Sequence, residues 1–155
     1  MASSEIIEAL QRCELFSTLD EEEIEQIATL SEIETYKAGD TVITQGEYGT
    51  KLYLIAEGQV ALLRSVNLGS RQGTMTIALL GRGRGVGWSA LICEPCSASA
   101  SAVCQKPSKL VSLEGTKLRE MLDARPEVGF QVMERLAYVL NDRLRAAYGA
   151  MDTFR

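Results

Sequence analysis

The stretch GRGRGVGW, residues 81–88, has the composition of a loop that binds phosphate. Its four glycines alternate with other residues, and a short helix is expected to follow. Backbone N–H groups at the start of such a helix bind anions, and here they would belong to Ser89 and Ala90. No arginine or lysine stands between Arg84 and Lys106, so the charge that would neutralise a phosphate is missing there.

Arg82 and Arg84 stand among these glycines. We expect both in a solvated turn, and the alternative is that Arg84 reaches an anion from the rim of a pocket. Further on, Ser97, Ser99 and Ser101 alternate with alanines. That pattern is typical of a strand with small polar side chains, and the alternative is a hydroxyl-lined site. The chain has no histidine to activate a serine, so we expect no enzyme activity.

Four cysteines are present, and Cys93 and Cys96 form a C-x-x-C motif. A zinc site would need a second pair at suitable spacing, which the sequence lacks. We therefore expect structural thiols, no metal ligands and no cofactor. A thiol redox or metal sensor built on Cys93 and Cys96 is the alternative.

The composition bounds the partners of this chain. Its net charge of −5 argues against a general nucleic-acid binder. No apolar run reaches the roughly 18 residues that span a bilayer, so we expect no membrane partner. The N-terminus lacks a charged region followed by an apolar segment, which indicates a cytoplasmic protein.

The elements that would position the glycine loop come in three groups. Residues 1–30 show helical apolar periodicity, and Asp20 with Glu23 forms a capping box. Residues 31–115 contain short alternating runs bounded by glycine turns, as expected for an all-β roll, with a long hairpin loop at 67–73. Residues 116–155 return to helices. We predict a single domain over 1–155.

The last helix, expected over about 126–154, carries two apolar faces. One face is formed by Val132, Leu136, Val139 and Arg143 and would pack on the roll. The other repeats every seven residues, which favours a homodimer over intramolecular packing alone. This predicted dimer seam comprises Ala137, Leu140, Leu144, Ala147, Met151 and Phe154.

Residues 36–60 strongly resemble the cyclic nucleotide-binding domain family found in Crp/Fnr-type regulators and kinase regulatory subunits. The matching positions are Tyr36, Gly39, Asp40, Gln45, Gly46, Gly49, Leu52, Tyr53, Ile55, Gly58 and Val60. The resemblance implies a mainly β fold with flanking helices, a double-stranded β-helix (jelly-roll) followed by a long C-terminal helix.

In that family the segment after Gly81 is the phosphate-binding cassette. Trp88 stands where the resemblance places a glutamate for the ribose, and the arginine for the cyclic phosphate falls near Ser99. Loss of such an arginine costs about 3–5 kcal/mol, or a hundredfold to ten-thousandfold in affinity. Trp88 would either fill the nucleotide pocket or form the floor of a pocket for another ligand. The predicted ligand-binding residues are Val86, Gly87, Trp88, Ser89, Ala90, Leu91, Ser99, Ala100 and Ser101.

These observations favour a non-catalytic, dimeric regulatory module with weak or absent usual-mode binding of cAMP or cGMP. It would signal through a protein partner or another small molecule. The alternatives are a genuine cyclic nucleotide sensor with unusual contacts, and the sensor part of a Crp/Fnr-like transcription regulator. The chain stops at Arg155, where the long helix ends, so we expect no DNA binding by this chain alone.

Overall fold

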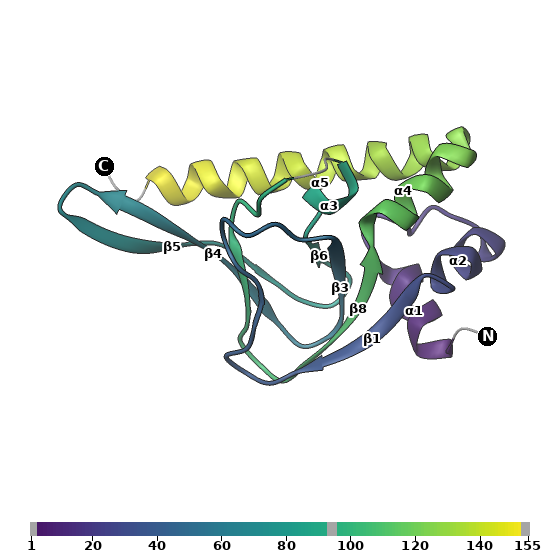
Figure 1. The fold of residues 1–155 in the computed structure, drawn as a ribbon, viewed down its shortest axis with the longest axis horizontal. Coiled ribbons are helices and arrows are strands. Elements are labelled where there is room, and N and C mark those ends of the chain that lie inside the picture. Colours follow the sequence, from purple (N-terminus) through teal and green to yellow (C-terminus); the bar gives the residue numbers. More distant parts are fainter. Residues whose placement is uncertain (1–2, 93–95, 153–155) are drawn as a thin grey trace.

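The fold is described for residues 3–92 and 96–152 of a computed structural model. Two helices open the chain, eight strands form a roll that a short helix interrupts, and two helices close it (Figure 1). Short turns separate most of the strands, and buried side chains of both sheets form the core of the roll. None of the described helices is long and apolar enough to cross a membrane.

The two N-terminal helices begin at caps that the sequence encodes. Helix α1 (Ser4–Arg12) begins after Ser3, whose side chain accepts the Ile6 N–H. Helix α2 (Glu21–Ala28) begins with the capping box that the sequence predicts, since Asp20 and Glu23 each accept the other's backbone N–H. The caps satisfy N–H groups that would otherwise lack a partner.

The first sheet has the strand order β1-β8-β3-β6 and its pairs are antiparallel. Its strands are β1 (Ser31–Tyr36), β8 (Ser108–Glu114), β3 (Lys51–Glu57) and the short β6 (Gly85–Val86). One face of this sheet packs on the helices and the other on the second sheet, so the side chains of β3 and β8 are buried or half-buried, apart from the exposed Glu57. The glycine loop therefore enters the sheet through β6, beside β3.

The second sheet has the order β2-β7-β4-β5. Its strands are β2 (Thr41–Ile43), β7 (Ser101–Cys104), β4 (Val60–Leu68) and β5 (Arg71–Leu80). The long hairpin loop expected at residues 67–73 was wrong: Asn67 pairs with Gln72 and Leu68 with Arg71, leaving a two-residue turn. Gly69 has a φ of 81°, which a tight two-residue turn requires and which glycine adopts readily. The polar composition of the segment had favoured a longer loop. The resulting β4–β5 hairpin projects beyond the roll (Figure 1).

Two buried clusters stabilise the fold. The smaller lies between the sheets and comprises Ile55, Val60, Leu80, Val86, Ala102, Cys104 and Leu110. The larger joins the first sheet to helices from both ends of the chain, and includes Leu10, Phe16, Ile24, Leu52, Trp88, Leu113, Leu118 and Val132. The helices are thus part of the domain core, because burying their apolar stripes requires the outer face of the sheet.

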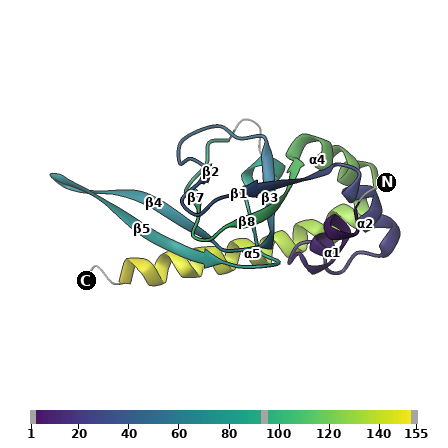
Figure 2. The same cartoon turned by 90° about the horizontal axis from the view of Figure 1, so that it is seen from below.

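Helix α4 (Gly115–Ala124) follows β8 directly, and α5 (Pro126–Asp152) starts at the proline that the sequence marks as a boundary. Figures 1 and 2 show α5 running the length of the molecule, from α1 and α2 to the β4–β5 hairpin. The face predicted to pack inward does so, since Val132, Leu136 and Val139 are buried. The short α3 (Ser89–Ile92) packs against β3 and α4.

Candidate ligand pocket

The glycines of residues 81–87 allow the loop to approach its neighbours closely. A Cβ on Gly85 would lie 2.4 Å from the Trp88 ring, and one on Gly87 would lie 2.8 Å from the Lys51 carbonyl oxygen. Both distances are shorter than a side chain tolerates. The loop is pinned to β3, where the Gly83 N–H donates to the Ile55 carbonyl and the Ile55 N–H donates to Arg84. The glycines therefore have packing roles as well as conformational ones.

An anion from the chain itself occupies the loop. The Gly85 N–H donates to Glu14 Oε2 at 3.0 Å, and Arg84 Nε lies 2.9 Å from Glu14 Oε1. Arg143 Nη2, from α5, lies 3.5 Å from the same carboxylate. Glu14 also donates its backbone N–H to Gly83, so the segment between α1 and α2 is held on the loop. Arg84 is thus paired, in contrast to the free, solvated turn that we expected.

The backbone N–H groups after the loop are less available than expected. We expected those of Ser89 and Ala90 to face an anion, but the Ala90 N–H donates to the Gly87 carbonyl at 3.0 Å. The turn from Gly87 into α3 closes on itself and takes up this donor. Helix α3 has four residues, too few to offer a strong N-terminal dipole.

A cavity of about 550 Å³ lies between the second sheet, the glycine loop and α5. Its volume is within the range of small-molecule sites. The predicted residues that line it are Val86, Gly87, Trp88, Ser89, Ser99 and Ala100. The tertiary structure thus brings both halves of the predicted cassette, residues 86–89 and 99–100, to one cavity.

Three predicted ligand residues lie elsewhere. Ala90 lines a neighbouring cavity, and Leu91 is buried in the helical core. Ser101 begins β7, where its hydroxyl accepts the Gln45 N–H at 2.9 Å, so it serves the fold. Of the strand expected over 97–101, only Ser101 is in a strand, while Ser97 forms an isolated bridge with Tyr48.

Two arginines that the sequence reasoning missed also line the cavity. Arg64, from β4, donates to the Ser99 carbonyl. Arg143, from α5, donates to the Gly85 carbonyl at 3.1 Å, and burial lowers the pKa of its guanidinium although the Glu14 charge opposes that shift. Neither arginine belongs to the cassette segment after Arg84, so the composition of that segment gave no sign of them. The sequence did place Arg143 on the inward face of the last helix, and this position could have indicated a cation facing the roll.

Trp88 is buried in the core and also forms part of a pocket wall, which combines the two roles that the sequence left open. Its side chain is buried with 5% exposure in the helical core, and it also lines the cavity. Its indole Nε1 is buried and has no hydrogen-bond partner among the described residues. An open cavity remains beside the ring, so Trp88 does not fill all the space between the roll and α5.

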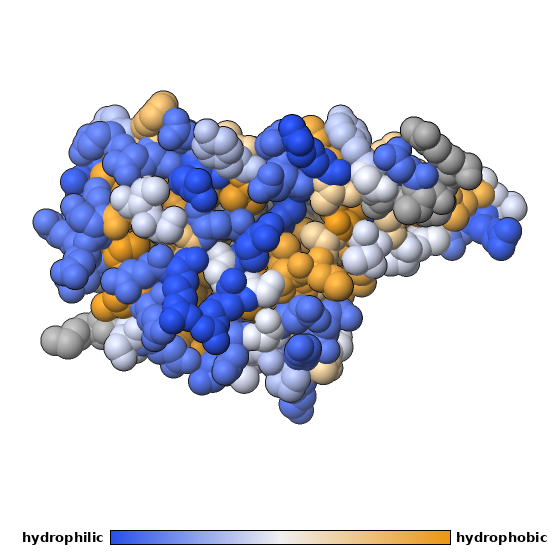
Figure 3. Space-filling model, turned by 180° about the vertical axis from the view of Figure 1, so that it is seen from behind, coloured by the Kyte–Doolittle hydropathy of each residue, from blue (hydrophilic) through white to orange (hydrophobic). Residues whose placement is uncertain are grey.

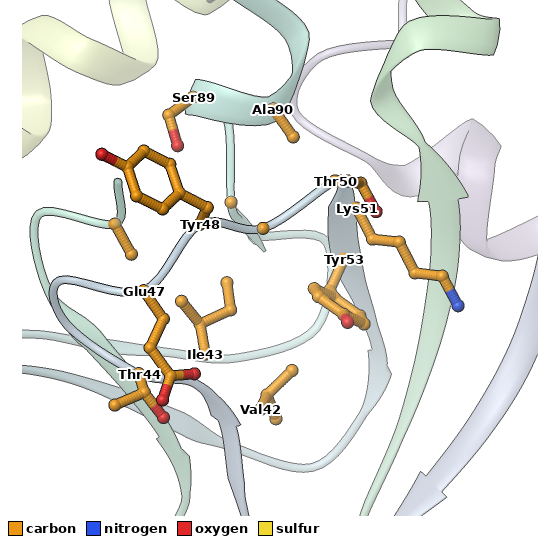
Figure 4. A pocket seen from close by; sticks show the side chains of 13 residues that line it. Val42, Ile43, Thr44, Glu47, Tyr48, Thr50, Lys51, Tyr53, Ser89 and Ala90 are labelled. Carbon is orange, nitrogen blue, oxygen red and sulfur yellow. The ribbon is translucent and has the colours of Figure 1, made fainter. Parts of the chain in front are cut away.

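The neighbouring cavity, of about 320 Å³, lies between β2, α3 and residues 44–51. Figure 4 shows Tyr48 beside Ser89 at one end, Val42 and Thr44 at the other, and the Lys51 amine pointing outward. Gly87, Ser89 and Ala98 line both cavities. This second cavity offers hydroxyl groups and one carboxylate, from Glu47, where the first offers guanidinium groups.

The C-x-x-C motif is only partly described, since Cys93 lies outside the described residues. Cys96 is disulfide-bonded, so the expectation of a structural thiol was wrong for this residue. Cys13 and Cys104 are buried free thiols, and burial raises the pKa of Cys13 to about 12. Such a thiol is unreactive near neutral pH. Within the described ranges, no group of three or more histidine, cysteine or acidic side chains could hold a metal ion.

A family model described as the cyclic nucleotide-binding domain matches residues 33–125, from β1 to the end of α4. The match includes both sheets, the glycine loop and the cavity walls other than α5. The chain belongs to the cyclic nucleotide-binding domain family. The predicted resemblance and the predicted jelly-roll fold with flanking helices are confirmed.

This cyclic nucleotide-binding domain is similar to several proteins of bacterial origin. It is 34% identical over 138 residues to a cyclic AMP receptor protein of Thermus thermophilus, covering 89% of this chain and 60% of that protein. It therefore spans well under the full length of that relative. A solved cyclic nucleotide-binding domain from Methylobacillus flagellatus superposes with a TM-score of 0.78 at 26% identity, covering 97% and 83% of the two chains. The N-terminal domain of a transcriptional regulator from Streptomyces coelicolor matches with a TM-score of 0.69 at 29% identity, over 90% and 94%.

The second half of α5 in this domain exposes the predicted seam. Leu140, Leu144 and Met151 have exposed fractions of 41%, 50% and 58%, while Phe154 lies outside the described residues. Phe130 is 67% exposed and lies seven residues before Ala137, so it extends the seam by one heptad toward the start of α5. Leu140, Leu144 and Ala147 also line the larger cavity, so seam and cavity share residues. On the side of the molecule opposite to Figure 1, hydrophobic residues form a surface patch bordered by hydrophilic ones (Figure 3).

Proposed function

We propose that this chain is a non-catalytic regulatory module that does not bind cAMP or cGMP in the family's usual mode. It acts as a homodimer through α5 and signals through a protein partner or a different small ligand. The larger cavity, between the roll and α5, is the site that such a ligand would use.

The observation that carries this proposal is the chemistry of the cassette. Trp88 is buried where the family resemblance places the ribose glutamate, and an indole N–H donates but cannot accept a hydrogen bond. The place of the phosphate arginine falls at Ser99, and Glu14 already holds the Gly85 N–H in the loop. A cyclic nucleotide bound here would lack its usual partners for both ribose and phosphate.

A second candidate function is a cyclic nucleotide sensor with unusual contacts. It is favoured by Arg64, whose guanidinium contacts the Ser99 carbonyl and thus brings a positive charge to the place of the missing arginine. Similarity to the cyclic AMP receptor protein supports a third possibility, the sensor part of a longer transcription regulator.

Isothermal titration with cAMP and with cGMP at millimolar concentration tests the proposal. We expect no saturable binding of either nucleotide. A matched variant, Ser99→Arg, returns an arginine to the cassette and should produce measurable binding, with Ala100→Arg as the check on a one-residue slip in register. Micromolar binding by the unmodified chain would overturn the proposal and favour the second candidate.

A further inference from the structure

We propose that the larger cavity binds a small amphipathic anion, and that its acidic group draws Arg143 away from Glu14. This inference rests on the proposed function, because it names the ligand class of the same site. It also makes α5 the element that responds to the ligand.

The body of the ligand is apolar because most of the cavity wall is apolar. Side chains of Leu62, Ile77, Val86, Trp88, Leu140 and Leu144 surround the space from three directions. A cavity of about 550 Å³ accommodates one or two rings or a short branched chain. Burial of such a body removes apolar surface from water on both sides, which favours binding.

The head group of the ligand is anionic because the charged side chains that line the cavity are arginines. Arg64 lies at its exposed edge and Arg143 lies in its half-buried wall. The described residues of the lining include no carboxylate. An anion is therefore attracted to the cavity and a cation is repelled, most strongly near Arg143, where water screens the charge least.

Arg143 is held by few contacts in the structure. A single nitrogen, Nη2, contacts both Glu14, at 3.5 Å, and the Gly85 carbonyl, at 3.1 Å. Its Nε is buried without an acceptor among the described residues. A buried donor without a partner is unfavourable, so a rearrangement that gives Nε an acceptor lowers the free energy.

Glu14 does not depend on Arg143. If Arg143 turns toward a ligand, Glu14 keeps the Gly85 N–H at 3.0 Å and Arg84 at 2.9 Å. Breaking a buried ion pair is usually unfavourable because it leaves one charge without a partner. Here the carboxylate of Glu14 keeps two partners, so the exchange avoids that cost. The consequence is that ligand binding releases the second half of α5 from the glycine loop while the loop itself stays in place.

Two dyes of matched shape test this inference. 8-Anilinonaphthalene-1-sulfonate carries an anionic group, and N-phenyl-1-naphthylamine is its neutral counterpart. Energy transfer from Trp88, the one tryptophan of the chain and part of the cavity lining, reports dye bound in or near the cavity. We expect saturable binding of the anionic dye that is tighter than binding of the neutral dye.

The variant Arg143→Gln should weaken binding of the anionic dye about tenfold, as expected for loss of one charge-assisted hydrogen bond. Its binding of the neutral dye should not change, which also shows that the variant is folded. Arg145→Gln is the matched control, since Arg145 is exposed on the same helix and outside the cavity lining. Glu14→Gln should strengthen binding of the anionic dye, because Arg143 then has no competing carboxylate.

Equal loss from Arg143→Gln and Arg145→Gln, or weaker anionic-dye binding after Glu14→Gln, would overturn the inference. If Arg143→Gln does not fold, Arg64→Gln at the cavity edge replaces it, and an unchanged preference for the anionic dye then counts against the inference. Competition with cAMP separates the two proposals. Displacement of the dye by micromolar cAMP would overturn the proposed function and leave the anion site standing, whereas a chain that binds neither dye overturns only the inference.

Discussion

The two halves of α5 lie in different surroundings. In the first half, Val132, Leu136 and Val139 are at most 3% exposed and pack in the helical core. In the second half, Leu144 and Met151 are at least 50% exposed, and Leu144 lines the larger cavity. The first half is thus held by buried apolar surface, whereas the second half lies along β5 and is joined to the glycine loop by Arg143. One helix therefore combines an anchored end with an end whose apolar side chains a ligand or partner can still cover.

The largest effect is expected when one leucine in each half of α5 is replaced by alanine. Leu136→Ala should lower the free energy of unfolding by about 2–5 kcal/mol, because it leaves a cavity in the core. Leu144→Ala should change it by less than about 0.5 kcal/mol in the monomer, since half of that side chain is already in water. Urea unfolding of both variants at low protein concentration measures the two values.

The same pair distinguishes stability from self-association. Under the proposed function, Leu144→Ala weakens the dimer, as measured by sedimentation equilibrium, while its monomer stays folded. Similar losses of stability in the two variants at low concentration would show that the second half is anchored as firmly as the first.

The glycine loop contains both a tightly packed position, Gly85, and a position with free space around it, Gly81. Gly85→Ala should lower stability by about 1–3 kcal/mol, because its Cβ would overlap the Trp88 ring. Gly81→Ala, four residues earlier, has no atom within 4 Å of the new Cβ and should change stability by less than about 1 kcal/mol. Unfolding followed by circular dichroism avoids the altered surroundings of Trp88. A neutral Gly85→Ala would mean that the ring can shift toward the cavity.

The polar link between the two regions is Glu14. Glu14→Gln removes the charge that Arg84 and Arg143 share and should cost about 1–3 kcal/mol. Glu8→Gln is the control, because Glu8 pairs with Arg12 on an exposed helix face, where such pairs contribute about 0–1 kcal/mol. Chemical denaturation measures both changes in the free energy of unfolding. If the two changes are equal, the contacts of Glu14 contribute no more to stability than an exposed ion pair does.

The smallest effect is expected in the roll, away from α5. Burial alone would raise the pKa of Glu34, but hydrogen bonds from Ser112 and Tyr36 and the charge of Lys51 outweigh it, so its pKa lies below the ordinary 4.5. The ionised carboxylate therefore stabilises the fold above that pH, and the contribution is lost as the pH falls through the lowered pKa.

The difference in stability between the unmodified chain and Glu34→Gln should accordingly be below about 1 kcal/mol near neutral pH and vanish in acid. Urea midpoints across the acid range measure it. A difference that grows as the pH falls would contradict the assigned direction of the shift.

The fold was more predictable than the site because each element carries local signals. The Asp20 capping box, the start of the last helix at Pro126 and the inward face of α5 were each predicted at the correct residues. The hairpin at 67–73 was not, because a polar strand that projects into solvent has the composition of a loop. Such a strand is specified by pairing with its partner and not by apolar alternation.

The family, the order of the helices and strands, and the lack of a cation in the cassette segment follow from neighbouring residues, so they could be predicted before the fold was known. The groups that surround the glycine loop in place of that cation could not, because they depend on tertiary packing. Glu14, Arg64 and Arg143 are separated by dozens of residues, and they gather around the glycine loop because the helices and the second sheet pack there. Local periodicity carries no information about such pairings, since they follow from which buried faces meet.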